Sequence, residues 1–413
     1  MHPILNTINK MQLIKRQVYT ERVKPFINKG IIKIFTGQRR VGKSYILLQL
    51  MQELKEIEPE ANIIFINLEF EEFRTIKNDT DLFEYLKNKF IEGKSNYLFI
   101  DEIQDIKGFE HVLRSLLAKN TCDIFITGSN AKMLSSELST YLSGRYIEFH
   151  IQSLNYQEFL IFHKLENNQQ SLMLYLTYGG LPYLSALPLT DEHAFEYLRN
   201  VYSTILLKDV VQRENIRNID FLENLLHYTA DNVGSLFSAN NISKYLKSQL
   251  TEISTNQVIN YLRTLTNAYL LNKVGRIDIN GLRKFEIGDK YYFEDIGLRN
   301  CHIGFSLQRD IHKLMENAVF LHLKNLQYEI FVGKKDNLEI DFVARRYGKK
   351  IYVQVAYLLA DENTQKREFG NLKAISDNYP KYVVSLDEFF RESDFEGIKH
   401  LNLKNFLCNN NLE

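Results

Sequence analysis

Four short apolar runs alternate with amphipathic stretches along the first third of the chain. The runs span residues 31–35, 62–68, 97–100 and 123–126, and helical stretches such as 43–56 lie between them. Ile, Phe and Leu dominate these runs without regular alternation with polar residues, which is typical of strands buried on both faces. The pattern therefore predicts an α/β domain over 31–153, in which helices cover both faces of a parallel sheet.

The rest of the chain shows three further patterns. Residues 154–221 are mostly helical and are interrupted at Gly179-Gly180-Leu181-Pro182, which predicts a helical connector. Two helical stretches followed by a hairpin signal at Asn280-Gly281 predict a winged helix over 222–300. A helix and three β runs then predict a small α/β domain over 301–413. Residues 1–30 hold six Lys or Arg and one acid, and we interpret them as a basic, solvated helix face.

Composition narrows the class of protein. The 413 residues are 45% hydrophobic and 25% charged, as in ordinary globular proteins. Lys and Arg number 51 and so do Asp and Glu, which argues against a polybasic nucleic-acid coat but leaves room for a local basic patch. The three cysteines are far apart, so zinc and disulfide frameworks are not expected. We see no secretory signal and no run of about 18 apolar residues, and we expect a cytoplasmic protein without membrane contact.

A phosphate-binding motif follows the first apolar run. Gly37-Gln-Arg-Arg-Val-Gly42-Lys43-Ser44 fits G-x-x-x-x-G-K-[ST] between a strand and a helix. In such a loop, backbone N–H groups and the helix N-terminus hold phosphates, the Lys reaches the β- and γ-phosphates and the Ser binds Mg²⁺. The alternative is a strand–turn–helix with an incidental Lys. We predict that ATP is bound by Gly37, Gln38, Arg39, Arg40, Val41, Gly42, Lys43 and Ser44.

Two further strands are predicted to end in polar residues. The run Tyr97-Leu98-Phe99-Ile100 is followed by Asp101 and Glu102, which we predict to bind Mg²⁺ together with Ser44 and to polarise the attacking water, respectively. The run ending at Ile126 is followed by Thr127, Ser129 and Asn130, which are candidates for sensing the γ-phosphate or orienting water. The alternatives are strands that merely end in polar turns.

Together these motifs resemble the AAA-type P-loop ATPases. The resemblance rests on G-Q-R-R-V-G-K-S, L-F-I-D-E-I-Q, I-T-G-S-N and Leu142-Ser143-Gly144-Arg145. Leu154-Asn155-Tyr156-Gln157-Glu158-Phe159 and Gly179-Gly180-Leu181-Pro182 extend it to a prokaryotic family in which the ATPase precedes a region of unassigned function. It implies Mg-dependent ATP hydrolysis in a switch or motor, and the chain is a candidate homo-oligomer.

The same resemblance makes Arg145 the candidate arginine finger, which would act on the nucleotide of a neighbouring subunit. The alternative for Arg145 is a surface salt bridge. Glu69, at the end of the second run, is either a third acidic contributor or a solvated strand end.

The predicted winged helix suggests a second partner. Asn256, Asn260 and Arg263 fall on one side of a helical stretch, opposite a row of apolar residues, and such side chains read base edges in double-stranded DNA. Residues 233–300 hold nine basic and six acidic residues, which is only mildly positive and weak support for phosphate binding. The alternative is a winged helix used for packing or for a protein partner.

The last hundred residues resemble a restriction-endonuclease-like fold. Glu316 falls on the first helix, Asp341 on a β run, and Gln354 and Ala356 where active members have an acid and a Lys. Because the cation is missing, we predict an inactive nuclease-like domain, unless Lys350 or Lys366 replaces it. Two alternatives to the ATP-driven switch stay open: a nucleotide-binding regulator with negligible turnover, and an ATP-gated nuclease.

Overall fold

The structure is a computed structural model that describes residues 14–131, 142, 144–214, 216–248, 254–279, 284–359, 362–387 and 394–412. It divides into two compact units. The N-terminal unit runs to Gln152 and includes Asn267–Tyr269, and the C-terminal unit comprises Ser153–Thr266 and Leu270 onward. No helix among the described residues is long and apolar enough to cross a membrane.

A five-stranded parallel sheet forms the centre of the N-terminal unit, in the order β2-β3-β4-β1-β5. The predicted parallel α/β fold is therefore confirmed. The fifth strand was not predicted, because Glu148 and His150 interrupt its apolar residues and it lies at the edge of the sheet with little burial. The carboxyl ends of parallel strands share one edge, so whatever follows β1, β3 and β4 meets there. The strands are β1 (Ile32–Thr36), β2 (Asn62–Asn67), β3 (Asn96–Asp101), β4 (Asp123–Gly128) and β5 (Tyr146–His150).

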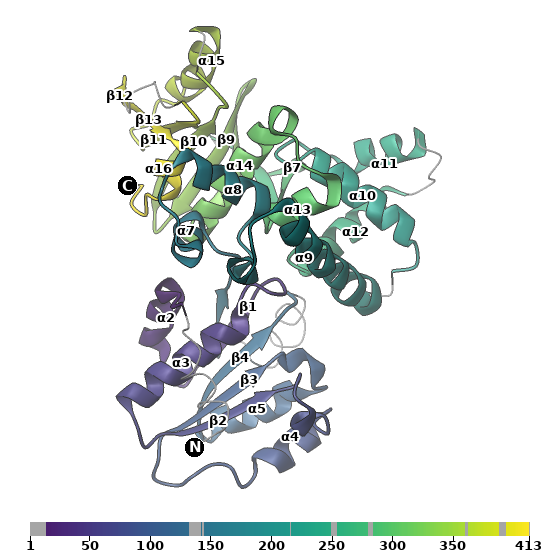
Figure 1. Cartoon of the computed structure of the whole chain (residues 1–413), viewed down its shortest axis with the longest axis vertical. Coiled ribbons are helices and arrows are strands. Elements are labelled where there is room, and N and C mark those ends of the chain that lie inside the picture. The colour runs from purple at the N-terminus through teal and green to yellow at the C-terminus, as the bar shows by residue number, and fades with distance from the viewer. Residues whose placement is uncertain are drawn as a thin grey trace. The chain divides into compact units, whose positions relative to one another are not determined.

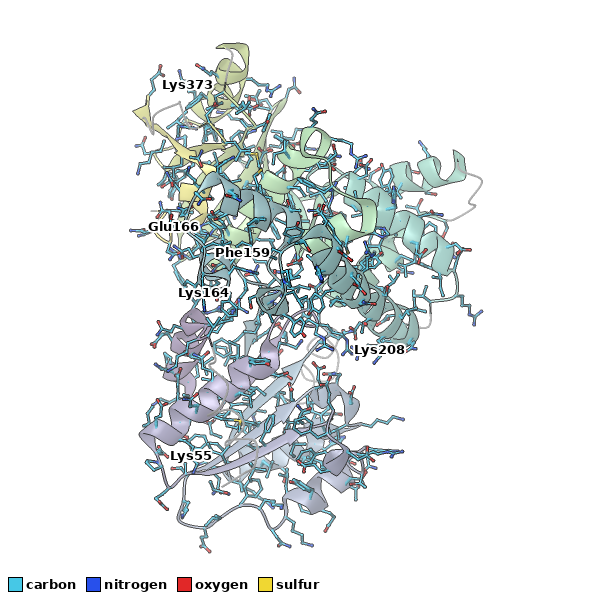
Figure 2. All side chains as sticks on the ribbon, viewed as in Figure 1. Lys55, Phe159, Lys164, Glu166, Lys208 and Lys373 are labelled. Atoms are coloured by element: carbon cyan, nitrogen blue, oxygen red, sulfur yellow. The ribbon has the colours of Figure 1, made fainter. Side chains whose placement is uncertain are left out.

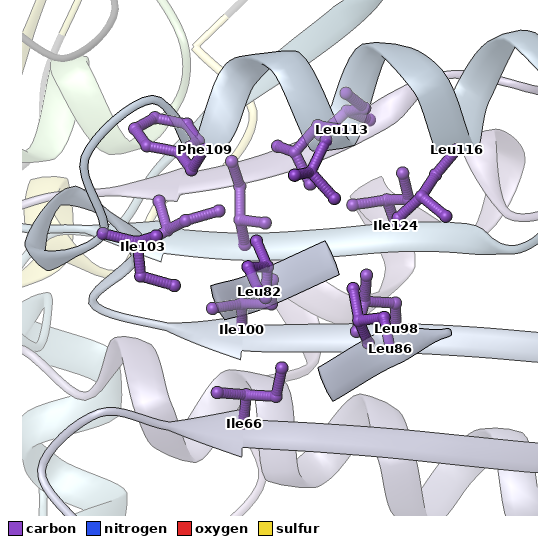
Figure 3. Packing of buried hydrophobic residues seen from close by; sticks show 14 of the residues in the cluster. Ile66, Leu82, Leu86, Leu98, Ile100, Ile103, Phe109, Leu113, Leu116 and Ile124 are labelled. Carbon is purple, nitrogen blue, oxygen red and sulfur yellow. The ribbon is translucent and has the colours of Figure 1, made fainter. Parts of the chain in front are cut away.

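Helices pack on both faces of this sheet (Figure 1). α4 (Asp79–Leu86) and α5 (Phe109–Ala118) cover one face, where alternate residues of β2, β3 and β4 join their apolar side chains in one core (Figure 3). On the other face the rings of Phe99 and Phe125 stack at 4.4 Å, and α3 (Lys43–Ile57) buries its apolar side. A strand that is covered on both faces has apolar side chains on both of its sides, which is why the apolar runs in the sequence are nearly continuous.

The basic N-terminal segment is packed against the domain. α2 (Gln17–Val23) and the short 3₁₀ turn Lys24–Phe26 precede β1, and α2 buries Tyr19, Thr20 and Val23. The expected solvated helix face is therefore only one side of this helix. Residues 1–13 lie outside the described part of the chain.

The C-terminal unit begins with helices that surround a buried glycine pair. A side chain at Gly179 would meet Asp295 Oδ1 at 2.3 Å, and one at Gly180 would meet the Leu154 carbonyl oxygen at 2.2 Å. Asp295 Oδ2 accepts a 2.8 Å hydrogen bond from the Gly180 N–H, which joins the helical region to the segment after β7. The helical elements are α7 (Tyr156–His163), α8 (Gln169–Tyr178), η5 (Pro182–Ala186), α9 (Asp191–Thr204), the π-helix η6 (Ile205–Gln212), α10 (Ile219–Asp231), α11 (Ala239–Ser248), α12 (Thr255–Asn267), α13 (Ile296–Ile303), α14 (Leu307–Asn325), α15 (Glu362–Lys373) and α16 (Leu403–Leu407).

One eight-stranded sheet spans the two domains that we expected after residue 222. Its order is β12-β13-β11-β10-β9-β8-β6-β7, and β6 pairs in parallel with β8. The predicted hairpin strands β6 and β7 are antiparallel, as expected, but they extend the sheet of the last hundred residues, so a boundary at 300 would cut it. Residues 280–283, including Asn280-Gly281, lie outside the described part. The strands are β6 (Leu271–Asp278), β7 (Lys284–Phe293), β8 (Glu329–Lys335), β9 (Leu338–Arg346), β10 (Lys349–Val355), β11 (Lys381–Ser385), β12 (Asp394–Phe395) and β13 (Ile398–Asn402).

One buried and two half-buried histidines make the C-terminal unit sensitive to acid. Burial lowers the pKa of His163, His302 and His322 to about 4, and His322 Nε2 lies 3.0 Å from the Asn409 carbonyl oxygen. The unfolded chain binds protons to these rings near pH 6.5 and the folded chain only near pH 4, so stability is lost as pH falls through this window. We expect His322→Gln to flatten the decline of the unfolding midpoint between pH 7 and about pH 4.5 in denaturant titrations.

The exposed His193 offers a matched control, since His193→Gln should leave that decline unchanged. If both variants lost stability with pH as steeply as the wild type, the depressed pKa of His322 would be wrong.

Candidate functional site

The loop between β1 and α3 has a tight left-handed backbone. The φ angles are 141° at Gly37, 66° at Arg40 and 96° at Gly42. A side chain at Gly37 would meet the Ile151 carbonyl oxygen at 2.1 Å, so this position has room only for glycine. The loop opens helix α3 with Gly42 as the N-cap, which places the positive end of the helix dipole at the loop.

Lys43 and Gln38 are buried within this loop. Lys43 Nζ donates to the carbonyl oxygens of Gly37 and Gln38 at 3.0 Å each, and lies 3.8 Å from Glu102 Oε1. Gln38 is fully buried, and neither its Nε2 nor its Oε1 atom has a hydrogen-bond partner among the described residues. A buried amide without partners costs free energy unless a ligand satisfies it, so the loop fits a phosphate group.

Arg16 supports the loop from the N-terminal segment, and sequence reasoning missed it. Its side chain is buried, and Nη1 donates to the carbonyl oxygens of Val41 at 2.9 Å and Gln152 at 3.0 Å. One guanidinium nitrogen thus ties the loop to the end of the domain. No local signal separates Arg16 from the other basic residues before β1, because its partners are distant in the sequence.

Asp101 ends β3 beside the loop. Its carboxylate is buried, Thr127 Oγ1 donates to Oδ1 at 2.5 Å, and the Ser44 side chain also hydrogen-bonds it. Burial raises the pKa of Asp101, while the hydrogen bonds from Thr127 and Ser44 oppose this shift. The structure therefore brings Ser44 and Asp101 together, and their side chains offer two oxygen atoms of the kind that Mg²⁺ prefers as ligands.

Glu102 follows in a left-handed backbone conformation, with a φ of 56°, and its N–H donates to Thr127 Oγ1 at 2.8 Å. Gln104 Nε2 donates to Glu102 Oε2 at 2.5 Å. Burial opposes the charged form of Glu102, but Lys43, Gln104 and Arg39 outweigh it and hold its pKa below the ordinary value. Glu102 is thus a carboxylate at neutral pH, oriented by its neighbours beside Lys43.

Comparisons with known proteins place the chain in a family. A family model described as an AAA domain matches residues 29–160. An uncharacterized protein of Haemophilus influenzae is 35% identical over 397 residues, covering 94% of this chain and 96% of its own length. The chain belongs to this family of AAA-domain proteins. An uncharacterized protein of Methanocaldococcus jannaschii is 31% identical over 418 residues, covering 96% of this chain and 90% of its own length. A second family model, described as a domain of unknown function, matches residues 169–309 of this chain.

The solved structures that resemble this chain are more distant from it. Aeropyrum pernix ORC1 in complex with DNA has a TM-score of 0.31 at 10% identity, covering 70% of this chain and 92% of that one. AMPPCP-bound DnaA from Aquifex aeolicus has a TM-score of 0.30 at 15% identity, with coverages of 60% and 85%. Likeness this distant does not bear on function.

The other candidates in the AAA domain lie in different places. Asn130 is buried just past β4, next to the buried Ser129. Glu69 is exposed after the edge strand β2, three strands from β1, so it does not join the site.

Arg145 is exposed, and its backbone carbonyl oxygen accepts a hydrogen bond from the Ile32 N–H at 3.0 Å, which places Arg145 at the amino edge of the sheet. Because β1 rises about 3.3 Å per residue, Arg145 is roughly 16 Å from its own loop and does not reach it.

Helix α12 presents the predicted DNA-reading residues to solvent. Asn256, Asn260 and Arg263 are exposed, whereas Val258 and Leu262 on the other side are buried. The helix therefore has the amphipathic arrangement that the sequence indicated, and contact with DNA stays a prediction.

Four charged side chains and a tyrosine form a cluster in the C-terminal unit, and all of them except the half-buried Glu339 are buried. Lys290 Nζ on β7 lies 2.9 Å from Glu316 Oε1, 3.1 Å from Glu339 Oε1 and 3.5 Å from Asp341 Oδ1. Tyr292 donates its hydroxyl to Glu316 Oε1 at 2.6 Å. We call these five residues the Lys290 cluster. Burial alone would lower the pKa of Lys290, but the three carboxylates outweigh it and hold that pKa well above its ordinary value.

The Lys290 cluster corrects the expectation that this region lacks a cation. Lys290 supplies one from β7, a strand outside the predicted motif, whereas Lys350 pairs with Asp377 at 2.8 Å. Lys366 lies in α15, and its side chain is outside the described part. Gln354 Oε1 accepts from the Asp341 N–H at 3.3 Å, and Ala356 is buried. Among the residues described, no group of Asp, Glu, His or Cys side chains is arranged to hold a metal ion.

We expect no DNA cleavage by the purified protein with Mg²⁺ or Mn²⁺, with or without ATP. The ammonium of Lys290 lies among the carboxylates that a nuclease would use for its metal, and Gln354 adds no charge. Phosphodiester hydrolysis is extremely slow without metal or cation at the scissile phosphate. A plasmid-nicking assay tests this, and metal-dependent nicking that disappears in Asp341→Ala would contradict it.

Proposed function

We propose that the protein binds ATP with Mg²⁺ at the Gly37–Ser44 loop and hydrolyses it. The observation that supports this most strongly is the convergence of Lys43, Glu102 and the Ser44–Asp101 pair at one edge of the sheet. Loop backbone and the amide of Gln38 would hold the phosphates, and Lys43 would exchange its loop carbonyls for phosphate oxygens. Ser44 and Asp101 would hold Mg²⁺, which when bound neutralises charge on the β- and γ-phosphates.

Glu102 is assigned to the attacking water. Its lowered pKa keeps it ionised, so it accepts a hydrogen bond from water and orients the oxygen toward the γ-phosphorus. The new P–O bond forms as the bond between the γ-phosphorus and the bridging oxygen breaks, ADP leaves, and the water proton passes to Glu102 or to the phosphate. Asn130, buried beside Ser129, would sense the γ-phosphate or orient the same water.

The cycle would drive a conformational switch or motor in the C-terminal unit, with double-stranded DNA at Asn256, Asn260 and Arg263 as a candidate partner. Steady-state phosphate release, measured with and without duplex DNA, tests both parts. Turnover that DNA stimulates supports action on DNA. ATP binding without measurable turnover would instead favour a nucleotide-dependent regulator.

We expect Arg145 to act on a nucleotide bound by a neighbouring subunit. Its position at the amino edge of the sheet separates it from its own loop, but leaves it exposed for a second copy. Arg145→Ala should lose about 10³-fold in turnover and keep ATP binding. Mixing it with Lys43→Ala protein should restore part of the activity, because one mixed interface then combines an intact loop with an intact arginine.

ATP turnover in the mixing experiment is measured on an oligomer that native mass spectrometry shows to contain both variants. No recovery in that oligomer, or wild-type turnover by Arg145→Ala alone, would contradict a role across the interface.

A further inference from the structure

A basic cavity lies at the turn between β9 and β10 in the C-terminal unit, and none of its lining residues belongs to the Gly37–Ser44 loop or to the Lys290 cluster. Its volume is about 600 Å³. Four cationic side chains and one acidic side chain, that of Glu329, line it. The whole chain has no net charge, so this local excess of positive charge is a feature of the site and not of the composition. The four cations are Arg345, Arg346, Lys349 and Lys350.

Arg345 and Arg346 are each held by an aromatic ring, and Arg345 also has a guanidinium N–H that donates no hydrogen bond within the described chain. Arg346 donates from Nη1 to the Leu326 carbonyl oxygen at 2.9 Å, and its guanidinium lies 4.6 Å from the ring centre of Tyr328. Arg345 lies over Phe331 at 5.0 Å, and its buried Nη2 has no hydrogen-bond partner within the described chain. A buried guanidinium N–H without an acceptor is costly, and an anionic oxygen in the cavity would satisfy it.

Asp377, a second acid beside this cavity, does not cancel its positive charge. Asp377 pairs with Lys350 at 2.8 Å, and it also draws Lys381 to within 3.8 Å. The Asp377 carboxylate is therefore matched by two lysines, and the cavity keeps its positive excess. Such a concentration of Arg and Lys favours a ligand with several phosphates rather than a single carboxylate.

Two tyrosines beside these cations are open to solvent. Tyr347 occupies the turn itself with a φ of 48° and is 92% exposed. Tyr379 is 40% exposed, and Lys350 Nζ lies 4.7 Å from its ring centre. An aromatic ring that is exposed to water contributes little to the stability of the fold. Next to bound phosphates, however, the ring offers a face on which an unpaired base stacks.

We propose that this cavity, together with Tyr347, binds single-stranded nucleic acid. Arg345, Arg346 and Lys349 would hold backbone phosphates, and Tyr347 would stack on a base. Bases in a duplex are already stacked and paired, so the tyrosine favours a single strand. A protein partner would need a binding surface with an apolar centre, whereas the exposed apolar groups that line this cavity are the rings of Tyr347 and Tyr379. The proposal does not depend on ATP binding, because every residue in it belongs to the C-terminal unit.

Fluorescence anisotropy of a labelled oligothymidylate of about 20 nucleotides tests the proposal with the full-length protein in the absence of ATP. Lys349→Glu should weaken binding about ten-fold at low salt and lower the slope of log affinity against log salt by about one. Tyr347→Ala should weaken binding about ten-fold and leave that slope unchanged, because stacking releases no counterions.

Two control variants match these changes outside the cavity. Lys208→Glu reverses an exposed lysine on η6 (Figure 2), and Tyr183→Ala removes a tyrosine that is 57% exposed. Both should bind the oligonucleotide as the wild type does. Unfolding midpoints of all four variants confirm that the fold is intact, and the loop variant Lys43→Ala should also retain the oligonucleotide.

The proposal is overturned if Lys349→Glu and Tyr347→Ala bind as tightly as the wild type. It is equally overturned if a duplex of the same length binds more tightly than the single strand. Polyglutamate that competes as well as the oligonucleotide, with no effect of Tyr347→Ala, would assign the cavity to an acidic protein segment instead.

Discussion

Lys43→Ala is expected to abolish ATP binding, whereas Glu102→Gln should bind ATP normally and turn it over about 10²–10⁴-fold more slowly. Lys43 is the buried cation of the loop, with its Nζ atom 3.0 Å from two loop carbonyl oxygens, so its loss removes the buried positive charge that phosphates would meet. Glu102→Gln keeps the size and hydrogen bonding of the side chain but removes the carboxylate that orients water. The two variants therefore separate binding from hydrolysis.

Binding is measured with a fluorescent ATP analogue, and turnover by steady-state phosphate release. Lys55→Ala is a control on the same helix, because Lys55 bonds to the carbonyl oxygens of Pro59 and Ala61 at the far end of α3 (Figure 2). Glu69→Gln is the acidic control, since Glu69 is exposed after an edge strand. Glu102→Gln that turns over at the wild-type rate would refute the role of Glu102, and Lys43→Ala that binds ATP would refute the site.

The candidate ATP site could be predicted from sequence because its parts are local. The loop spacing, the strand before it and the helix after it are contiguous, and Asp101 and Glu102 directly follow an apolar run. In a parallel sheet the carboxyl ends of strands share one edge, so local patterns are enough to bring Ser44 and Asp101 together.

The parts that could not be predicted depend on contacts between distant segments. Arg16 reaches the carbonyl oxygen of Gln152, 136 positions away, and no periodicity reports such a contact. Lys290 enters the carboxylate cluster because β7 joins the same sheet as β8 and β9, while its own sequence context indicates only a hairpin strand. The eight-stranded sheet continues across the predicted boundary at 300 for the same reason, since strand order in a mixed sheet follows from packing rather than from the order of elements.

Lys290→Met is expected to lower the free energy of unfolding by about 3–5 kcal/mol. Removing one partner of a buried ion pair leaves an uncompensated buried charge, and Glu316 and Asp341 would here be left facing each other. Burial already raises the pKa of Glu316 against the opposing effect of Lys290, so the variant should raise it further. A carboxyl group whose folded pKa exceeds its unfolded value binds protons on folding, so the deficit of the variant should shrink as the pH falls toward about 5.

Urea titrations at pH 7.5 and about pH 5 measure both the loss and its pH dependence. Lys273→Met is the matched control on β6, because Lys273 is 52% exposed and pairs with Asp289 at 2.8 Å, and it should cost less than about 1 kcal/mol at either pH. Adding Glu316→Gln to Lys290→Met should recover part of the loss, since it removes the charge that lost its partner. A cost for Lys290→Met that equals the Lys273→Met control, or that does not change with pH, would mean that the ammonium does not balance the buried carboxylates. The acids of the Lys290 cluster would then have to be protonated in the folded protein, and the charge of Lys290 would not be needed to balance them.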